Sequence, residues 1–195
     1  MACCVPSGER PRGGVGSDVT GALVLRSDAC LAHVPGAEIW VGVRTPGTEV
    51  AERATRIETA LRDAGHRVVE AQPHDDDVLL RVHDPRLVEH LRTVYARWVE
   101  AGFLDEPGQD RVVPYLIPSA GMLDGLPERE PTAVHAAAGR WCYDTMTLVG
   151  PGTWEAARGA VDVTQSAVDA VVAGEPLAYA LARPPGHHVT KAAYG

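Results

Sequence analysis

The chain has 195 residues, of which 45% are hydrophobic and 23% charged, so one domain with one sizeable core is expected. Its formal net charge of −8 argues against nucleic acid as a partner, because duplex binding normally requires a basic face. No stretch approaches the roughly 20 apolar residues of a membrane span, and four scattered cysteines favour a reducing, cytoplasmic location over a disulfide framework or zinc finger.

The first elements along the chain follow an α/β order. Residues 1–20 are rich in Gly, Pro, Ser and Arg and show no period, so we expect a disordered leader there. A short strand is expected over 22–25. A helix over 49–64 follows, with Thr48 as its N-cap, and a strand over 67–71 comes next. This succession of a helix and a strand is the first indication of an α/β layout.

Two helices are expected in the middle of the chain. Residues 74–77, His-Asp-Asp-Asp, could bind a metal, but a solvated acidic turn that caps a short helix over 77–82 is the favoured interpretation. Asp84 and Pro85 mark the N-cap and the first position of the next helix, which ends at Gly102.

A long proline-rich segment separates these helices from the last third of the chain. Residues 103–131 exceed an ordinary connection, so we expect them to form the rim of a binding site. A short Ala-rich helix over 132–143 follows. Thr153 is expected to cap a long helix over 154–173, which leads into a buried strand over 177–182. The side chains expected on the buried face of the long helix are Ala157, Val161, Val168, Val171 and Val172.

The last expected strand runs directly into Arg183-Pro-Pro-Gly-His-His188. The prolines stiffen this exit, and Gly186 allows a backbone conformation or a close approach that a side chain would block. Open α/β sheets place their ligands at the carboxyl ends of strands. Paired histidines there can ligate a metal, act as general acid and base, or stabilise an oxyanion. A histidine that merely caps a turn is the plain alternative.

The segment over 183–188 resembles the signature of the zinc-dependent deacetylases, which include histone deacetylases, acetylpolyamine amidohydrolases and acetoin-utilisation proteins. Three further stretches, over 38–65, 82–88 and 151–157, are similar to parts of the same family. The resemblance implies an α/β fold, a three-layer α-β-α domain with a mainly parallel, arginase/deacetylase-like sheet. Residues 21–195 would be its N-terminal part, truncated after the histidine loop.

The same resemblance implies a reaction, the hydrolysis of an acetamide on a lysine or a small amine by zinc-bound water. It implies that His188 is the general base and that His187 is a hydrogen-bonding partner of the water. Asp144 would hold the substrate at the rim of the site, with a turn-capping role as the alternative. Gly186 and Tyr194 would lie close to the tunnel for the acetylated amine.

The resemblance also implies that the zinc ligands, and a tyrosine that polarises the carbonyl, come after Gly195. No Asp-x-His triplet occurs in the chain. Because a catalytic zinc site needs three protein ligands, we expect the 195-residue chain alone to bind no stoichiometric zinc and to be inactive.

Two departures from the polyamine-specific pattern bear on the substrate. Residues 133–136 carry no carboxylate where such members have one, and Asp144 is the histone deacetylase choice. Together they favour acetylated lysine in proteins, or a broad range of small acetylated amines. Three alternatives stay open: an acetylpolyamine amidohydrolase, a non-catalytic α/β binding module derived from the same fold, and an arginase-like metal enzyme with another substrate. Homo-oligomers are compatible with each of these.

Overall fold

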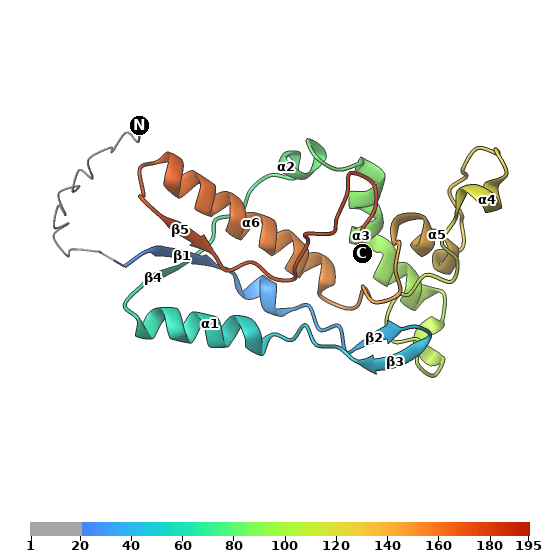
Figure 1. Cartoon of the computed structure of the whole chain (residues 1–195), viewed down its shortest axis with the longest axis horizontal. Helices are drawn as coiled ribbons and strands as arrows, with labels where there is room; N and C mark the ends of the chain where they lie inside the picture. The colour runs from blue at the N-terminus through green and yellow to red at the C-terminus, as the bar shows by residue number, and fades with distance from the viewer. Residues whose placement is uncertain (1–20) are drawn as a thin grey trace, which may run out of the picture.

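Three parallel strands form the central sheet, in the order β4-β1-β5 (Figure 1). They are β1 (Leu23–Arg26), β4 (Arg67–Glu70) and β5 (Ala178–Ala180), so each expected strand is present. The computed structural model describes residues 21–195, and the leader expected over 1–20 lies outside the described residues.

The sheet lies between two helix layers, which confirms the predicted α/β class. On one face, Leu23 and Leu25 of β1 form a core cluster with Val163 of α6 (Thr153–Val172). Successive side chains of a strand point to opposite faces. Arg26 therefore points away from α6, and it pairs with Glu58 of α1 (Glu52–Asp63) at 3.7 Å.

The buried face of α6 differs from the predicted one. The buried residues are small for the most part: Ala156, Gly159, Val163, Ser166 and Ala167. Val168, Val171 and Val172 are exposed instead, Val172 by 82%. The buried face is the one that packs on the sheet through Val163 and Ala167 and meets a short 3₁₀ helix, η1 (Asp28–Leu31), at Gly159. A Cβ added at Gly159 would lie 2.9 Å from the Cβ of Ala29, so larger side chains do not fit at this crossing.

Two predicted N-caps are wrong. Helix α1 begins at Glu52 and has Ala51 at its N-cap. Thr48 lies four residues before this start, and its amide and hydroxyl both donate to a carboxylate oxygen of Glu38. Helix α6 has Gly152 at its N-cap, in the left-handed conformation with φ 75°.

The side chain of Thr153, the first residue of α6, is engaged elsewhere. Its hydroxyl accepts from the amide of Gly150 at 2.9 Å and also contacts Nδ1 of His33 at 2.9 Å. The third predicted cap, Asp84, is confirmed, because its carboxylate accepts from the amide of Arg86 at 2.9 Å at the start of α3 (Pro85–Glu100).

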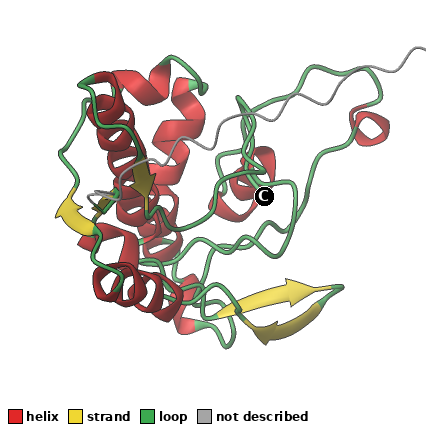
Figure 2. Ribbon diagram, turned by 60° about the vertical axis from the view of Figure 1, so that its left-hand side comes forward, coloured by secondary structure: helices red, strands yellow, loops and turns green. Residues whose placement is uncertain are grey.

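A second core lies outside the sheet, between α3 and α5 (Val134–Trp141). Its buried members include Leu87, Trp98, Trp141 and Tyr194. Three short helices complete this half: α2 (Asp77–Leu80), η2 (Phe103–Asp105) and α4 (Ala120–Leu123). Figure 2 shows the segment that carries α4 as an arm extending away from the other helices.

A β-hairpin that the sequence did not predict is also present. It consists of β2 (Ala37–Trp40) and β3 (Val43–Pro46), which pair antiparallel. Val41 and Gly42 form its two-residue turn with φ values of 49° and 79°, the left-handed pair that tight hairpins use. Within the described part of the chain, no helix is both long and apolar enough to cross a membrane.

Candidate active site

The two sequence-predicted catalytic residues lie side by side, on a loop at the carboxyl end of β5. The ring centroids of His187 and His188 are 4.0 Å apart, with the ring planes tilted by 46°, and both side chains are exposed. Sheet pairing continues one residue past β5, where the amide of Leu181 donates to the carbonyl of Leu25 at 2.9 Å. The loop then leaves the sheet through a cis peptide at Arg183–Pro184.

Arg183 anchors the start of the loop inside the protein. Its side chain is buried, and Nη1 donates to the carbonyl of Cys30 at 2.8 Å while Nη2 donates to that of His33 at 2.6 Å. Glu49 supplies the opposite charge, with its carboxylate oxygens 3.1 Å from Nε and 2.8 Å from Nη2. In the sequence, Arg183 was recognisable only as part of the motif over 183–188. Its place directly after an apolar strand is the feature of the sequence that could have predicted a buried ion pair.

Hydrogen bonds to carbonyl groups fix the other end of the loop. The hydroxyl of Tyr143 donates to the carbonyl of His188 at 2.5 Å. The amide of Asp84 donates to the carbonyl of Lys191 at 2.8 Å, and Nδ1 of His83 lies 3.0 Å from that of Thr190. Tyr143 and His83 are thus supports of the histidine loop that the sequence analysis did not identify.

Asp144 uses its carboxylate within its own turn. Oδ1 accepts from the amides of Met146 and Thr147 at 2.9 and 2.8 Å, and Oδ2 accepts from the hydroxyl of Thr147 at 3.1 Å. These are the contacts of the turn-capping alternative. The role at the substrate rim stays a prediction.

Tyr194 and Gly186, the other two predicted substrate-binding residues, are in different environments. Tyr194 is buried in the core between α3 and α5, where burial raises its pKa well above the ordinary value. Gly186 is exposed, and a Cβ added there would meet no atom within 4 Å. The steric reason expected for this glycine is therefore absent among the described residues, and the substrate-binding roles of both residues stay predictions.

A buried, neutral histidine lies next to the Arg183 anchor. His33 contributes its carbonyl to Arg183 and its Nδ1 to Thr153. Burial, reinforced by the positive charges of Arg183 and Arg111, lowers the pKa of His33 to about 4. The imidazole is therefore uncharged near neutral pH, which avoids a second positive charge beside the guanidinium.

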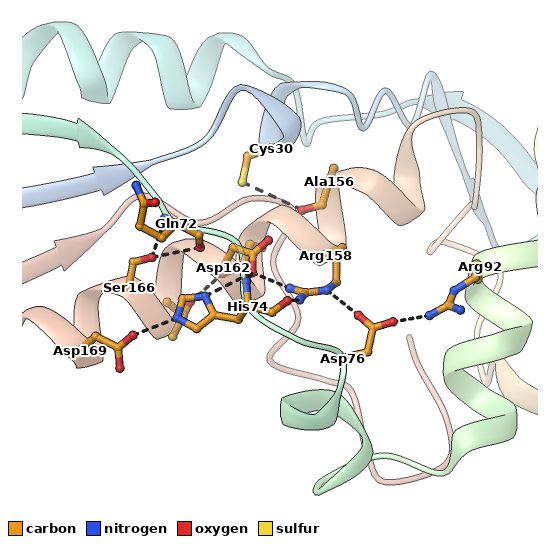
Figure 3. A network of polar contacts seen from close by, with 12 residues as sticks. Cys30, Gln72, His74, Asp76, Arg92, Ala156, Arg158, Asp162, Ser166 and Asp169 are labelled. Atoms are coloured by element: carbon orange, nitrogen blue, oxygen red, sulfur yellow. Dashed lines mark hydrogen bonds and ion pairs between the residues drawn. The ribbon is translucent and has the colours of Figure 1, made fainter.

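The stretch over 74–77 is only partly the solvated turn that we expected: Asp75 and Asp77 are exposed, whereas His74 and Asp76 contact α6. His74 lies between two carboxylates, with Nδ1 3.3 Å from Asp162 and Nε2 2.9 Å from Asp169 (Figure 3). Arg158 links Asp162 to Asp76 at 2.7 and 2.9 Å. Asp76 precedes α2 without capping it, because its side chain makes no cap hydrogen bond.

These contacts predict a stability that falls in alkaline solution. The hydrogen bond that His74 donates to Asp169, supported by Asp162, raises the pKa of His74, so the folded state binds the proton more tightly than the unfolded state. The resulting stability is complete below about pH 6.5, the ordinary pKa, and is lost as the pH rises through the raised value. We expect His74→Gln to be less stable than the wild type at pH 6, by under about 1 kcal/mol for a partly solvated pair.

Denaturant unfolding at pH 6 and pH 9 measures this effect. The difference in unfolding free energy between the wild type and His74→Gln should shrink at pH 9. In a chain that already carries Asp169→Asn, which removes one partner of His74, adding His74→Gln should cost less stability at pH 6 than it does in the wild type. A difference that grows toward pH 9 would show that His74 is not held as a cation.

A mostly apolar hollow of about 450 Å³ lies at the base of the segment over 103–131. Phe103, Gln109, Val113, Pro114 and Tyr115 line it from this segment, together with Ile39, Trp98, His135 and Thr145. Its volume is within the range of ligand pockets. The segment therefore borders a concave surface, and its role as the rim of a binding site stays a prediction.

The sheet and the histidine loop define a parallel α/β protein with a candidate acid–base pair at the carboxyl end of a strand. A model of the histone deacetylase domain matches residues 47–195, and the chain belongs to this family. The resemblance found in the sequence is thereby confirmed.

Named relatives narrow the comparison. An acetylpolyamine amidohydrolase from Mycoplana ramosa is 32% identical over 152 residues, which cover 77% of this chain and 42% of that protein. The crystal structure of an acetylpolyamine aminohydrolase from Burkholderia pseudomallei matches with a TM-score of 0.80 at 30% identity, covering 90% of this chain and 48% of the other. A histone deacetylase-like amidohydrolase from Pseudomonas aeruginosa is 54% identical over 41 residues, 20% of this chain and 11% of that protein. The chain spans about half the length of the acetylpolyamine amidohydrolases that it matches.

Proposed function

We propose that this chain supplies the acid–base histidines of an amidohydrolase that removes an acetyl group from a primary amine. The observation that supports the proposal is the exposed pair His187 and His188, on an anchored loop at the carboxyl end of β5. The match to the Burkholderia pseudomallei aminohydrolase supports it further, because that structure aligns with 90% of this chain.

Amide hydrolysis needs a proton taken from water and a proton given to the leaving amine. His188, as a neutral imidazole, would accept the proton of the attacking water and return it to the amine nitrogen as the C–N bond breaks. His187, whose ring lies 4.0 Å away, would donate a hydrogen bond to the water or to the developing oxyanion. The two roles require a fixed backbone, because a small displacement of either ring misaligns the proton transfer.

The zinc ion that the resemblance implies finds no adequate set of ligands in the described part of the chain. No group of three His, Cys, Asp or Glu side chains among residues 21–195 is arranged to hold a metal. A catalytic zinc site requires three such ligands. We therefore derive no step of the reaction through zinc from these residues.

We propose an acetylated polyamine, or a similar small acetylated amine, as the substrate. The relatives from Mycoplana ramosa and Burkholderia pseudomallei are named for this activity. The argument for acetylated lysine rested partly on Asp144, whose carboxylate is engaged by its own turn. A net charge of −8 also suits a cationic polyamine better than an anionic partner.

A chimeric enzyme tests this proposal. Residues 21–195 are joined to the part of the Burkholderia pseudomallei enzyme that has no counterpart in this chain, and the intact relative is the control. We expect the chimera to hydrolyse an acetylated polyamine with a kcat/KM at least about tenfold above that for an acetyl-lysine peptide, the discrimination that 1–3 kcal/mol of differential binding gives.

Each other outcome points to a different function. A preference for the acetyl-lysine peptide, in a chimera whose parent prefers polyamines, would assign the specificity of a protein deacetylase to this chain. A chimera that folds like the intact relative but hydrolyses neither substrate would favour the non-catalytic binding module.

A further inference from the structure

Arg183 carries a charge that is almost completely removed from solvent, with 3% of the residue exposed. A buried guanidinium is costly unless its donors and its charge are satisfied. Here Nη1 and Nη2 donate to the carbonyls of Cys30 and His33, Nε donates to Glu49, and Nη2 also contacts the backbone carbonyl of Glu49 at 3.2 Å. The side chain therefore connects the end of β5 to residues that lie at least 134 positions earlier in the sequence.

These contacts hold the Arg183 side chain at several donor atoms at once. Its acceptors come from Cys30 in η1, from His33 and from Glu49 before α1. A displacement of the Arg183 backbone would break several hydrogen bonds together and leave the largely buried Glu49 carboxylate with only the more distant Arg53, at 3.6 Å, as a cationic partner.

A short, stiff connection joins Arg183 to the histidine pair, so the position of Arg183 restricts the backbone of the pair. Pro184 and Pro185 directly follow Arg183, and a proline ring fixes φ near −65°, so little backbone freedom remains before the pair. On the far side, the hydroxyl of Tyr143 holds the carbonyl of His188 at 2.5 Å. Two exposed imidazoles thus lie on a backbone that is held at both ends. Figure 1 shows the course of this segment after β5 in red.

We propose that Arg183 is a positioning residue, which sets the orientation of His187 and His188 through the two prolines, and that Glu49 holds Arg183 in place. The importance of Arg183 for catalysis rests on the function proposed above. The positioning itself is a property of this chain and can be measured without turnover.

The experiment compares two arginine variants of the 195-residue chain by NMR of the histidine ring protons. Arg183→Lys keeps the charge but loses the planar, forked donors. Arg158→Lys is the matched control, since Arg158 is also largely buried and bonds two carboxylates and a carbonyl, but it lies in the network of Figure 3. The signals of His187 and His188 are assigned from their single glutamine variants.

We expect both lysine variants to unfold at lower denaturant concentrations than the wild type. Only Arg183→Lys should shift and broaden the ring signals of both His187 and His188. If Arg183→Lys leaves those signals at their wild-type positions, or if Arg158→Lys moves them equally, Arg183 has only a structural role and the proposal is wrong.

A second variant covers the case in which Arg183→Lys does not fold. Glu49→Gln retains the two hydrogen bonds from Arg183 to the carbonyls and removes only the paired charge. It should shift the same ring signals by a smaller amount, and unchanged signals in a folded Glu49→Gln chain would overturn the proposal. An inactive chimera with wild-type ring signals in this chain would instead contradict the proposed function.

Discussion

His188→Ala is expected to lower kcat of the chimeric enzyme by about 10²- to 10⁴-fold, with a small change in KM, because general acid–base catalysis contributes a factor of this size. The side chain is exposed and makes no hydrogen bond to the rest of residues 21–195, so its loss should cost little stability. The backbone carbonyl that Tyr143 holds remains in the variant. Steady-state kinetics on an acetylated polyamine measure the effect.

The pH profile separates the roles of the two histidines. His188→Ala should lose the acidic limb of the kcat profile, since that limb reports the base. His187→Ala should keep the limb while losing rate, as expected for a hydrogen-bonding partner. His66→Ala, at the amino end of β4, is the control and should retain nearly full kcat. If His187→Ala alone removes the limb, the two assignments must be exchanged.

The elements predicted correctly from the sequence are those with local determinants. Apolar residues between turns predicted the three strands of the parallel sheet, and Asp84-Pro85 predicted the start of α3, because the cap and the fixed proline φ act within two residues. The histidine loop was predicted for a similar reason, since its composition is unusual over six consecutive residues. Such features need no knowledge of what packs against them.

The features that were missed depend on partners distant in the sequence. Thr48 does not cap α1, which begins at Glu52, and its amide and hydroxyl bind Glu38, ten residues earlier. The buried face of α6 is the one that packs on β1 and meets η1 at Gly159, about 130 residues later in the sequence than η1. The contacts of Arg183 with Cys30 and His33 span 153 and 150 residues. The candidate bases were therefore found from the sequence, but the supports that fix them in space were not.

Acid is expected to destabilise the protein between pH 6.5 and pH 4, because two buried histidines stay neutral in the fold. Burial lowers the pKa of both His33 and His90 to about 4, from an ordinary value of 6.5. Between these values the unfolded chain binds more protons than the folded one, so the free energy of unfolding decreases as the pH is lowered. At about 1.4 kcal/mol per pKa unit, protonation of each histidine lowers the free energy of unfolding by on the order of 3 kcal/mol across this range.

His90 is the better site for the test, since both of its ring nitrogens are buried without a hydrogen-bond partner among residues 21–195. Its ring lies 6.1 Å from those of Trp141 and Tyr194, so phenylalanine should pack in its place. Urea unfolding from pH 7 to pH 4 should give His90→Phe a shallower loss of stability than the wild type, while Leu91→Met, a control in the same helix, keeps the wild-type slope. An unchanged slope in His90→Phe would mean that His90 takes up its proton without unfolding, and that the core between α3 and α5 admits a charge.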